Sequence, residues 1–163
     1  MKSLLILYHS RTGGTEAMAQ AALEGAREEP GVTARFLTAA EATPDDLLAA
    51  DGAIFACPEN LASMAGVMKD FFDRAYYPVL GRIEGRPYAT MICAGSDGEG
   101  AARQIARIAT GWRMKPIAEP LIVCTHAQTP EAILAPKTIS AEDLARCHDL
   151  GQALAAGLAM GVF

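Results

Sequence analysis

The chain has 163 residues, of which 51% are hydrophobic and 20% are charged, as expected for one globular domain with a sizeable core. Lys and Arg number 14 and Asp and Glu 19, a net charge of −5 with no basic cluster, which argues against nucleic-acid binding. No stretch approaches the roughly 20 apolar residues of a membrane helix, and no secretory signal is recognisable. The four cysteines form no C-x-x-C pair and no metal-type group with histidine. We expect a cytoplasmic protein with no metal, nucleic-acid or membrane partner.

Short apolar runs alternate with longer segments of helical period along the whole chain. The runs predict strands at residues 3–8, 32–37, 52–57, 87–94 and 117–124. The segments between them predict helices at residues 16–29, 66–77, 100–110 and 141–158, with a short helical turn at 44–48. Strands that alternate with helices in this way predict an α/β fold, in which a five-stranded parallel sheet is covered by helices on both faces.

Local signals refine several of these elements. Thr43 precedes Pro44 and predicts a cap on the short helical turn, while Ser140 with Asp143 predicts a capped start for the last helix. Pro116 and Pro120 confine the last strand to an edge of the sheet, where a missing N–H is tolerated. No repeat or linker divides the chain, so we expect a single domain over residues 1–163.

The segment after the first strand runs directly into a helix and reads His9-Ser10-Arg11-Thr12-Gly13-Gly14-Thr15. In open α/β sheets, ligands bind outside the carboxyl ends of the strands. A helix N-terminus offers unpaired N–H groups, hydroxyls add donors, and glycines let the backbone wrap around an anion. This loop therefore predicts a phosphate site.

Two familiar nucleotide motifs are absent from this loop. It contains neither the G-x-x-x-x-G-K-[ST] of a triphosphate-binding loop nor the G-x-G-x-x-G of a dinucleotide-binding turn. Hydroxyls without a lysine indicate a monophosphate held mainly by neutral donors. The same residues are also compatible with an ordinary tight turn that carries a Ser/Thr cap.

The loop resembles the [ST]-x-T-G-x-T phosphate loop of the flavodoxin superfamily. The resemblance implies a flavodoxin-like three-layer sandwich with strand order 2-1-3-4-5 and FMN as the cofactor. It also implies that the 5′-phosphate of FMN is bound by Ser10, Arg11, Thr12, Gly13, Gly14 and Thr15. Arg11 departs from a purely neutral loop, and its side chain either adds charge at the phosphate or points to solvent.

A second motif, from Pro58 to Arg74, is similar to a segment of the NAD(P)H-dependent FMN reductases and related quinone reductases. In those families the loop after the proline runs along the ribityl chain and the flavin ring. The resemblance therefore implies flavin contacts for Pro58, Glu59, Asn60, Leu61, Ala62, Ser63 and Met64. We expect Met68, Phe71 and Phe72, in the helix that follows, to be core residues.

A third motif is the glycine-rich turn after the fourth strand. Its backbone can approach a planar ring and donate N–H groups to the ring carbonyls. The resemblance implies contacts to the pyrimidine edge of the flavin from Ala94, Gly95, Ser96, Asp97 and Gly98. Taken alone, this turn is equally an ordinary connection, but three such loops at the ends of three strands favour FMN.

The ring-binding loops contain no aromatic residue between 59 and 65 or between 94 and 100. An uncovered ring face leaves room for a nicotinamide or a quinone to stack for hydride transfer. We therefore predict an enzyme in which NAD(P)H reduces FMN and FMN reduces a small-molecule acceptor such as a quinone or a free flavin. The chemistry is flavin-centred, and no catalytic side chain is nominated. A flavodoxin-type electron carrier and a domain that no longer holds a cofactor are the alternatives.

Three features stay open on the sequence alone. Glu59, if it lies near the ring, would disfavour an anionic reduced flavin. The segment from 125 to 139 is long for a connection without regular structure, and it either covers the flavin or contacts a second subunit. His126 in this segment lines the same pocket or has a surface or capping role. The apolar end of the last helix, from Leu154 to Met160, is compatible with core packing or with a homo-oligomer interface.

Overall fold

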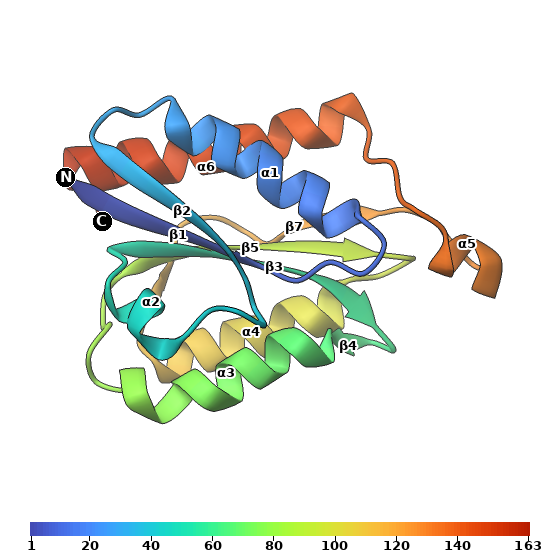
Figure 1. Cartoon of the computed structure of the whole chain (residues 1–163), viewed down its shortest axis with the longest axis horizontal. Helices are drawn as coiled ribbons and strands as arrows, with labels where there is room; N and C mark the ends of the chain where they lie inside the picture. The colour runs from blue at the N-terminus through green and yellow to red at the C-terminus, as the bar shows by residue number, and fades with distance from the viewer.

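The computed structural model describes residues 1–163 as a three-layer sandwich, in which a parallel sheet is covered by helices on both faces (Figure 1). The main strands are β1 (Lys2–Tyr8), β2 (Val32–Thr38), β3 (Gly52–Asn60), β5 (Pro87–Ala94) and β7 (Leu121–Cys124). They pair in the order β2-β1-β3-β5-β7, and all of these pairings are parallel. The predicted fold class and the predicted order of five strands are confirmed.

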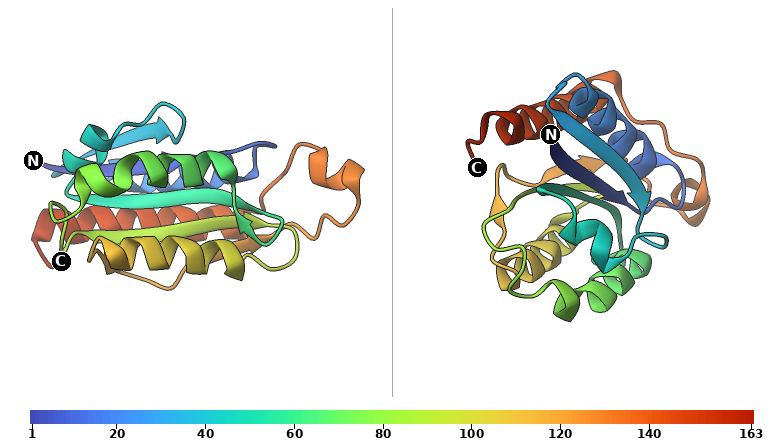
Figure 2. Two further views of the ribbon diagram at one scale, coloured as in Figure 1. Left: turned by 90° about the horizontal axis from the view of Figure 1, so that it is seen from below. Right: turned by 60° about the vertical axis from the view of Figure 1, so that its left-hand side comes forward.

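Helices cover both faces of the sheet (Figures 1 and 2). The first face carries α1 (Gly14–Arg27) and α6 (Ala141–Met160), which pack against each other along their lengths. The second face carries α2 (Pro44–Leu48), α3 (Gly66–Val79) and α4 (Glu99–Gly111). Both termini lie near the amino-terminal ends of the strands, so the opposite end of the sheet contains neither terminus (Figure 1).

Each face of the sheet has its own hydrophobic core. Phe55 of β3 packs with Phe71 and Phe72 of α3 and with Trp112 on one side. Met18 and Leu154 belong to the core on the other side, under α1 and α6. The predicted core residues of α3 are confirmed, since Met68, Phe71 and Phe72 are all buried.

Two of the predicted caps are present. Thr43 and Asp46 form a reciprocal capping box at α2, with the Thr43 amide donating to the Asp46 carboxylate at 2.8 Å. The Ser140 hydroxyl accepts from the Asp143 amide at 3.1 Å and caps α6. Such caps satisfy N–H groups that have no partner inside the helix, so each one marks a helix start.

The last strand differs from its prediction. In place of one strand over 117–124, the chain forms β6 (Lys115–Pro116) and β7, and both pair with β5. Tyr88 pairs with Pro116 but Met91 pairs with Leu121, so two extra residues are accommodated between them. The two prolines, which lack an N–H, interrupt the ladder, and the edge position tolerates the interruption as predicted.

Two further corrections concern the loops at the carboxyl ends of the strands, hereafter the carboxyl edge of the sheet. Strand β3 does not end at Cys57 but continues to Asn60 and turns back through Leu61 and Ala62 into β4 (Ser63–Met64). The segment from 125 to 139 is not without regular structure, because it contains α5 (Pro130–Leu134), which projects beyond the sheet (Figure 2). Thr129 caps α5 and Pro130 occupies its first turn, which are helix-start signals.

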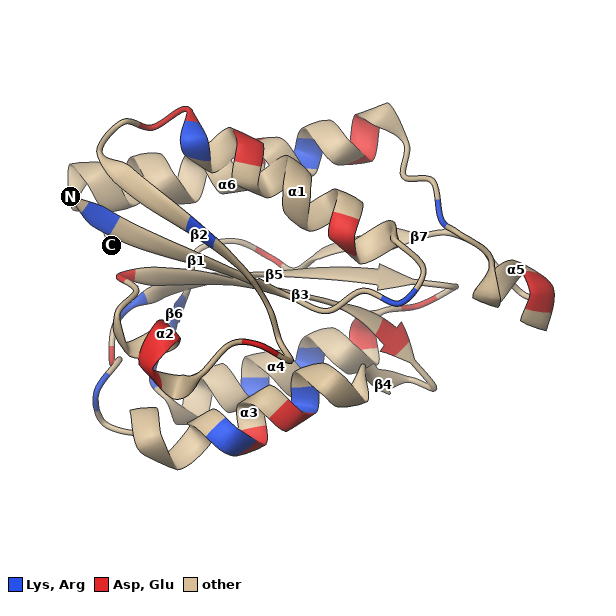
Figure 3. Cartoon of the chain, in the orientation of Figure 1, with Lys and Arg blue, Asp and Glu red and all other residues tan.

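Positive and negative side chains are interspersed over the helices and loops (Figure 3). None of the helices combines the length and the apolar character that a membrane span requires.

Candidate functional site

A cavity of about 490 Å³ lies at the carboxyl edge of the sheet, within the size range of small-molecule sites. It is formed by the loops that follow β1, β3, β5 and β7, as the fold class predicts. Twenty residues line it: Ser10, Arg11, Thr12, Gly14, Thr15, Pro58, Glu59, Asn60, Leu61, Ala62, Cys93, Ala94, Gly95, Ser96, Thr125, Ala127, Gln128, Ile133, Leu134 and Lys137.

The three predicted loops meet in this cavity, and thirteen of the eighteen predicted contact residues line it. The other five do not: Gly13, Ser63, Met64, Asp97 and Gly98. Gly13 and Gly98 instead occupy the N-cap positions of α1 and α4. The Asp97 carboxylate accepts from the Glu99 amide at 3.3 Å, and Ser63 and Met64 are bonded to Gln104 of α4.

The loop after β1 presents free hydrogen-bond donors. Its Gly13 has φ +93°, a left-handed conformation that favours glycine, and this turns the chain into α1. The first helical amide with a backbone acceptor is that of Ala17, which donates to the Gly13 carbonyl at 3.0 Å. The amides of Gly14, Thr15 and Glu16 therefore point out of the helix end without a backbone partner, where an anion is stabilised.

Side chains of the same loop complete this donor set. Thr12 and Thr15 bring hydroxyls to the cavity, while the Ser10 hydroxyl accepts from the Gly13 amide at 3.1 Å and shapes the turn. Arg11 is exposed and forms no ion pair within the chain. Burial and the positive charge of Arg11 lower the pKa of His9, which favours the neutral imidazole.

The hairpin of β3 and β4 is fastened to the start of α4. The Gln104 side-chain oxygen accepts from the Met64 amide at 2.8 Å and from the Ser63 hydroxyl at 3.0 Å. A Cβ atom on Gly100 would lie 2.1 Å from the Ala62 carbonyl oxygen, so only glycine permits this contact. The loops after β3 and β5 thus form one rigid wall of the cavity.

Glu59 has a structural role in this wall. Its carboxylate accepts from the amides of Gly98 at 2.9 Å and Ala101 at 3.1 Å, so it caps α4 from a neighbouring strand. Negative charge at a helix N-terminus is stabilised by the helix dipole. Both of its oxygens therefore accept hydrogen bonds from the start of α4.

The segment 125–139, hereafter the arm, forms the remaining wall. Backbone bonds join it to two of the other loops: the Lys137 amide donates to the Thr12 carbonyl at 2.9 Å, and the amides of Thr125 and His126 donate to the carbonyls of Ala94 and Gly95 at 2.8 Å. The arm contributes Thr125, Ala127, Gln128, Ile133, Leu134 and Lys137 to the cavity.

Sequence reasoning did not single out these arm residues, nor Cys93. One signal was available for Thr125, because it directly follows the last strand and therefore lies at the same edge as the other loops. His126 does not line this cavity. It has φ +60° and lines a second cavity of about 480 Å³, which the arm forms with the end of β7 and the start of α6.

The residues of the cavity fit FMN chemically. Unpaired amides and hydroxyls gather at the loop after β1 and suit a phosphate. The walls farther along combine small and aliphatic residues with polar ones such as Asn60 and Gln128, which suits a ring that carries carbonyl groups and a hydroxylated chain. A three-layer sandwich with such a cavity at the carboxyl edge of its strands defines a flavodoxin-like protein.

Comparisons with known proteins are consistent with this class. A flavodoxin structure from the domain Archaea superposes with a TM-score of 0.77 at 20% identity, covering 96% of this chain and 98% of that one. A flavodoxin of Aquifex aeolicus is 36% identical over 108 residues, which cover 65% of this chain and 56% of that protein. A protein of Acidithiobacillus ferrooxidans named NAD(P)H dehydrogenase (quinone) is 38% identical over 94 residues, covering 45% of this chain and 47% of that protein.

The model of the NADPH-dependent FMN reductase family matches residues 37–129, more than half of the chain. The chain therefore belongs to this family, and FMN is its cofactor. The matched residues include the loops after β3 and β5 but not the loop after β1. The chain spans about half the length of the curated relatives that it matches.

Proposed function

We propose that this chain is an FMN-dependent oxidoreductase that takes hydride from NAD(P)H and reduces a quinone, a free flavin or a similar small acceptor. When bound, FMN supplies the redox chemistry: NAD(P)H and one proton convert the quinone into hydroquinone and leave NAD(P)⁺. The side chains of the protein bind and orient the cofactor, and none is required as an acid or a base.

The loop after β1 would hold the phosphate of FMN. The free amides of Gly14, Thr15 and Glu16 and the hydroxyls of Thr12 and Thr15 offer five donors in a short stretch of chain. Hydrogen bonds to a charged group contribute about 1.5–3 kcal/mol each. The donors belong to the end of α1, which packs against α6 and the sheet, so they are preorganised for the anion.

The hairpin wall and the turn after β5 would hold the ribityl chain and the ring. The bond of Glu59 to the start of α4 and the bond of Gln104, in α4, to Met64 keep this wall in one position. The amides of Gly95 and Ser96 have no backbone acceptor, and both residues line the cavity, so these amides are available to a planar ring that carries carbonyl groups. The wall therefore positions the flavin without enclosing it in aromatic side chains.

None of the twenty residues that line the cavity is aromatic, and this observation carries the choice of an enzyme over an electron carrier. Aromatic side chains stacked on a flavin contribute of order 1 kcal/mol each and occupy the ring face. Without them, a nicotinamide or a quinone has room to stack on the flavin. The name of the quinone dehydrogenase relative supports the same proposal.

The proposal is tested by anaerobic titration of the FMN-loaded protein with NADPH and, separately, with NADH. We expect at least one of them to bleach the visible flavin absorbance, and subsequent addition of a quinone to restore it. Bleaching by dithionite but by neither nicotinamide would contradict the enzyme and favour the carrier, for which the flavodoxin relative is the supporting observation. Failure to bind FMN would contradict both.

A further inference from the structure

Lys137 carries a positive charge that no acidic group of the protein neutralises. It takes part in none of the ion pairs of the chain. Its ammonium donates instead to the carbonyl oxygens of Ile133 at 2.7 Å and Ala135 at 2.6 Å. An ammonium has three N–H donors, so the third one has no protein partner. Lys137 is partly buried and lines the cavity at the carboxyl edge, and a cation in such a position without a counter-ion is a reason to look for an anion.

The side chain of Lys137 starts beside the loop that follows β1. The Lys137 amide donates to the Thr12 carbonyl at 2.9 Å, which joins the arm to this loop. A Cβ atom on Gly14, the first residue of α1, would lie 3.2 Å from the Cβ atom of Lys137 and 2.8 Å from the Sγ atom of Cys93. Lys137 and Cys93 therefore both lie against Gly14, whose amide is one of the free donors at the start of α1.

The charge of Lys137 acts inside the cavity. Burial raises the pKa of the Cys93 thiol, and the positive charge of Lys137 opposes this rise because it stabilises the thiolate. Cys93 lines the cavity and is only 7% exposed, so the field of the ammonium reaches the buried side of Gly14. Arg11, the other cation that lines the cavity, is exposed, and water and salt screen its charge more strongly.

We infer that the Lys137 ammonium pairs with the phosphate of FMN and makes the cofactor site selective for this phosphorylated flavin over riboflavin. The inference rests on the proposed position of the phosphate at the loop after β1. A phosphate monoester carries a charge of about −1.5 to −2 at pH 7, whereas the amides and hydroxyls of that loop are neutral. A hydrogen bond between two charged groups is shorter and stronger than one between neutral groups, so an ammonium contributes more than a further hydroxyl.

The same ammonium holds the end of α5, so one side chain connects the phosphate to the arm. Two of its donors remain on the carbonyls of Ile133 and Ala135, and the third is available to the phosphate without a rearrangement of the arm. A bound phosphate therefore fixes the arm through Lys137, and a flavin without a phosphate does not. Amide hydrogen exchange in the arm should slow more when FMN binds than when riboflavin binds.

The test compares FMN with riboflavin, which has the same ring and ribityl chain but no phosphate. Lys137→Met removes the charge and keeps an unbranched side chain against Gly14. We expect its FMN dissociation constant, measured by quenching of flavin fluorescence, to rise about 30-fold, as for the loss of one hydrogen bond to a charged group. Its riboflavin dissociation constant should stay within about threefold of the wild type, because riboflavin lacks the anion. Lys137→Arg keeps the charge and should restore most of the FMN affinity.

Lys115→Met is the matched control. Lys115 is also a lysine without an ion pair, but it lies in β6, beside the amino-terminal end of β5. Its substitution should leave the affinity for both flavins unchanged. Added salt should weaken FMN binding more in the wild type and in Lys115→Met than in Lys137→Met, because the screened charge is absent from the last variant.

Two results would overturn this role of Lys137. Equal losses of FMN and riboflavin affinity in Lys137→Met would show that the side chain acts only through the shape of the arm. FMN affinity within about twofold of the wild type would show that the ammonium does not reach the phosphate. If removal of the Thr12 and Thr15 hydroxyls still weakens FMN binding in that case, the proposed phosphate position stands and only the role of Lys137 fails. These titrations use no NAD(P)H, so they are independent of whether a nicotinamide reduces the flavin.

Discussion

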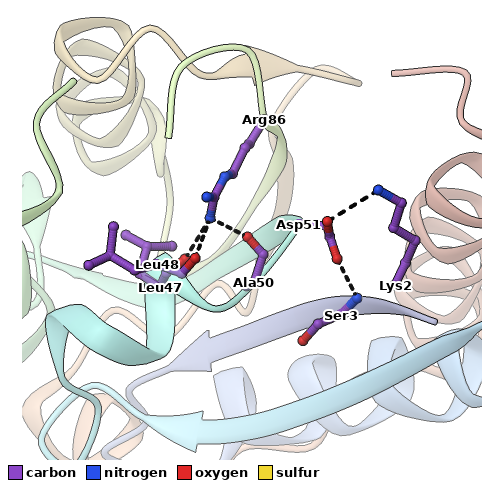
Figure 4. Close-up of polar contacts among 7 residues, drawn as sticks. All are labelled: Lys2, Ser3, Leu47, Leu48, Ala50, Asp51 and Arg86. Carbon is purple, nitrogen blue, oxygen red and sulfur yellow. Dashed lines mark hydrogen bonds and ion pairs between the residues drawn. The ribbon is translucent and has the colours of Figure 1, made fainter. Parts of the chain in front are cut away.

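The end of the sheet where the strands begin (the amino-terminal edge) and the end where they finish (the carboxyl edge) differ in whether their polar groups are paired within the protein. At the amino-terminal edge, Arg86 donates to the carbonyls of Leu47, Leu48 and Ala50 at the end of α2, and Asp51 accepts from Lys2 and from the Ser3 amide (Figure 4). At the carboxyl edge, the amides at the start of α1 have no backbone acceptor and Leu61 is fully exposed.

This difference indicates that the amino-terminal edge contributes to the stability of the fold and the carboxyl edge to ligand binding. Groups that are paired within the chain stabilise the fold but are not free to bind a ligand. Donors without a protein partner and exposed apolar side chains add little to folding and remain available to a ligand. We therefore expect substitutions at the amino-terminal edge to change the free energy of unfolding and not cofactor affinity. Substitutions at the carboxyl edge should do the reverse.

The largest effect is expected from Thr12→Ala with Thr15→Ala at the carboxyl edge. The loss of two hydroxyl donors to a charged phosphate should weaken FMN binding by about 2–4 kcal/mol, measured by quenching of FMN fluorescence. Thr110→Ala is the control, because the Thr110 hydroxyl is bonded to the Ala106 carbonyl at the far end of α4. Unchanged FMN affinity in the double variant would show that the phosphate lies elsewhere.

Arg86→Ala tests the amino-terminal edge. It leaves three partly buried carbonyl groups without their shared donor, which should lower the free energy of unfolding by about 2–3 kcal/mol in urea. FMN affinity should stay within twofold of the wild type. Arg82→Ala is the control, since Arg82 is exposed and makes only a 3.4 Å contact to the Pro78 carbonyl. An equal effect of both substitutions would refute the role of the Arg86 network.

Glu59→Gln sharpens the comparison, because Glu59 lies at the carboxyl edge but its carboxylate is hydrogen-bonded within the protein. The amide keeps only one acceptor oxygen and loses the charge at the start of α4, so the free energy of unfolding should fall by about 1 kcal/mol. Glu99→Gln is the control, since Glu99 lies in the first turn of the same helix. A shift in the flavin reduction potential without a change in stability would place the Glu59 charge at the ring instead.

The smallest effect is expected at Asp51, where the contribution of the carboxylate to the free energy of unfolding should depend on pH. Partial burial raises the pKa of its carboxyl group, but the Ser3 amide, Lys2 and the charge of Arg86 lower this pKa more, so the net shift is downward. A lowered pKa stabilises the folded state above about pH 4, the unfolded value, and this contribution is lost as the pH falls through the folded value.

Asp51→Asn should therefore be less stable than the wild type at pH 6, and the difference should shrink below about pH 4. Urea unfolding of both proteins over a series of pH values measures this difference in the free energy of unfolding. FMN affinity at pH 6 should be the same for both, since Asp51 lies far from the carboxyl edge. A difference that persists undiminished to pH 3 would mean that the carboxylate charge is not the stabilising feature.

Much of this molecule follows from its sequence alone. The apolar runs, helix caps and prolines predicted the five strands, the crossovers and the edge position of the last strand. These signals are local: a buried parallel strand is apolar on both faces, and a cap lies within three residues of the helix that it starts. The loop from Ser10 to Thr15 was predicted for the same reason, because its hydroxyls, its glycines and its helix are contiguous in the chain.

Only the tertiary structure decided what Glu59, Gln104 and the arm do. Glu59 caps a helix that begins 40 residues later, Gln104 fixes a hairpin from another strand, and Ile133 and Leu134 share a cavity with Leu61. These contacts join residues that are distant in the chain and depend on how α4 and the arm pack against the sheet. Local sequence patterns carry no information about such distances, so the side walls of the cavity could be assigned only from the structure. The loop predicted to bind the phosphate is one contiguous segment, and for that reason the sequence alone could propose it.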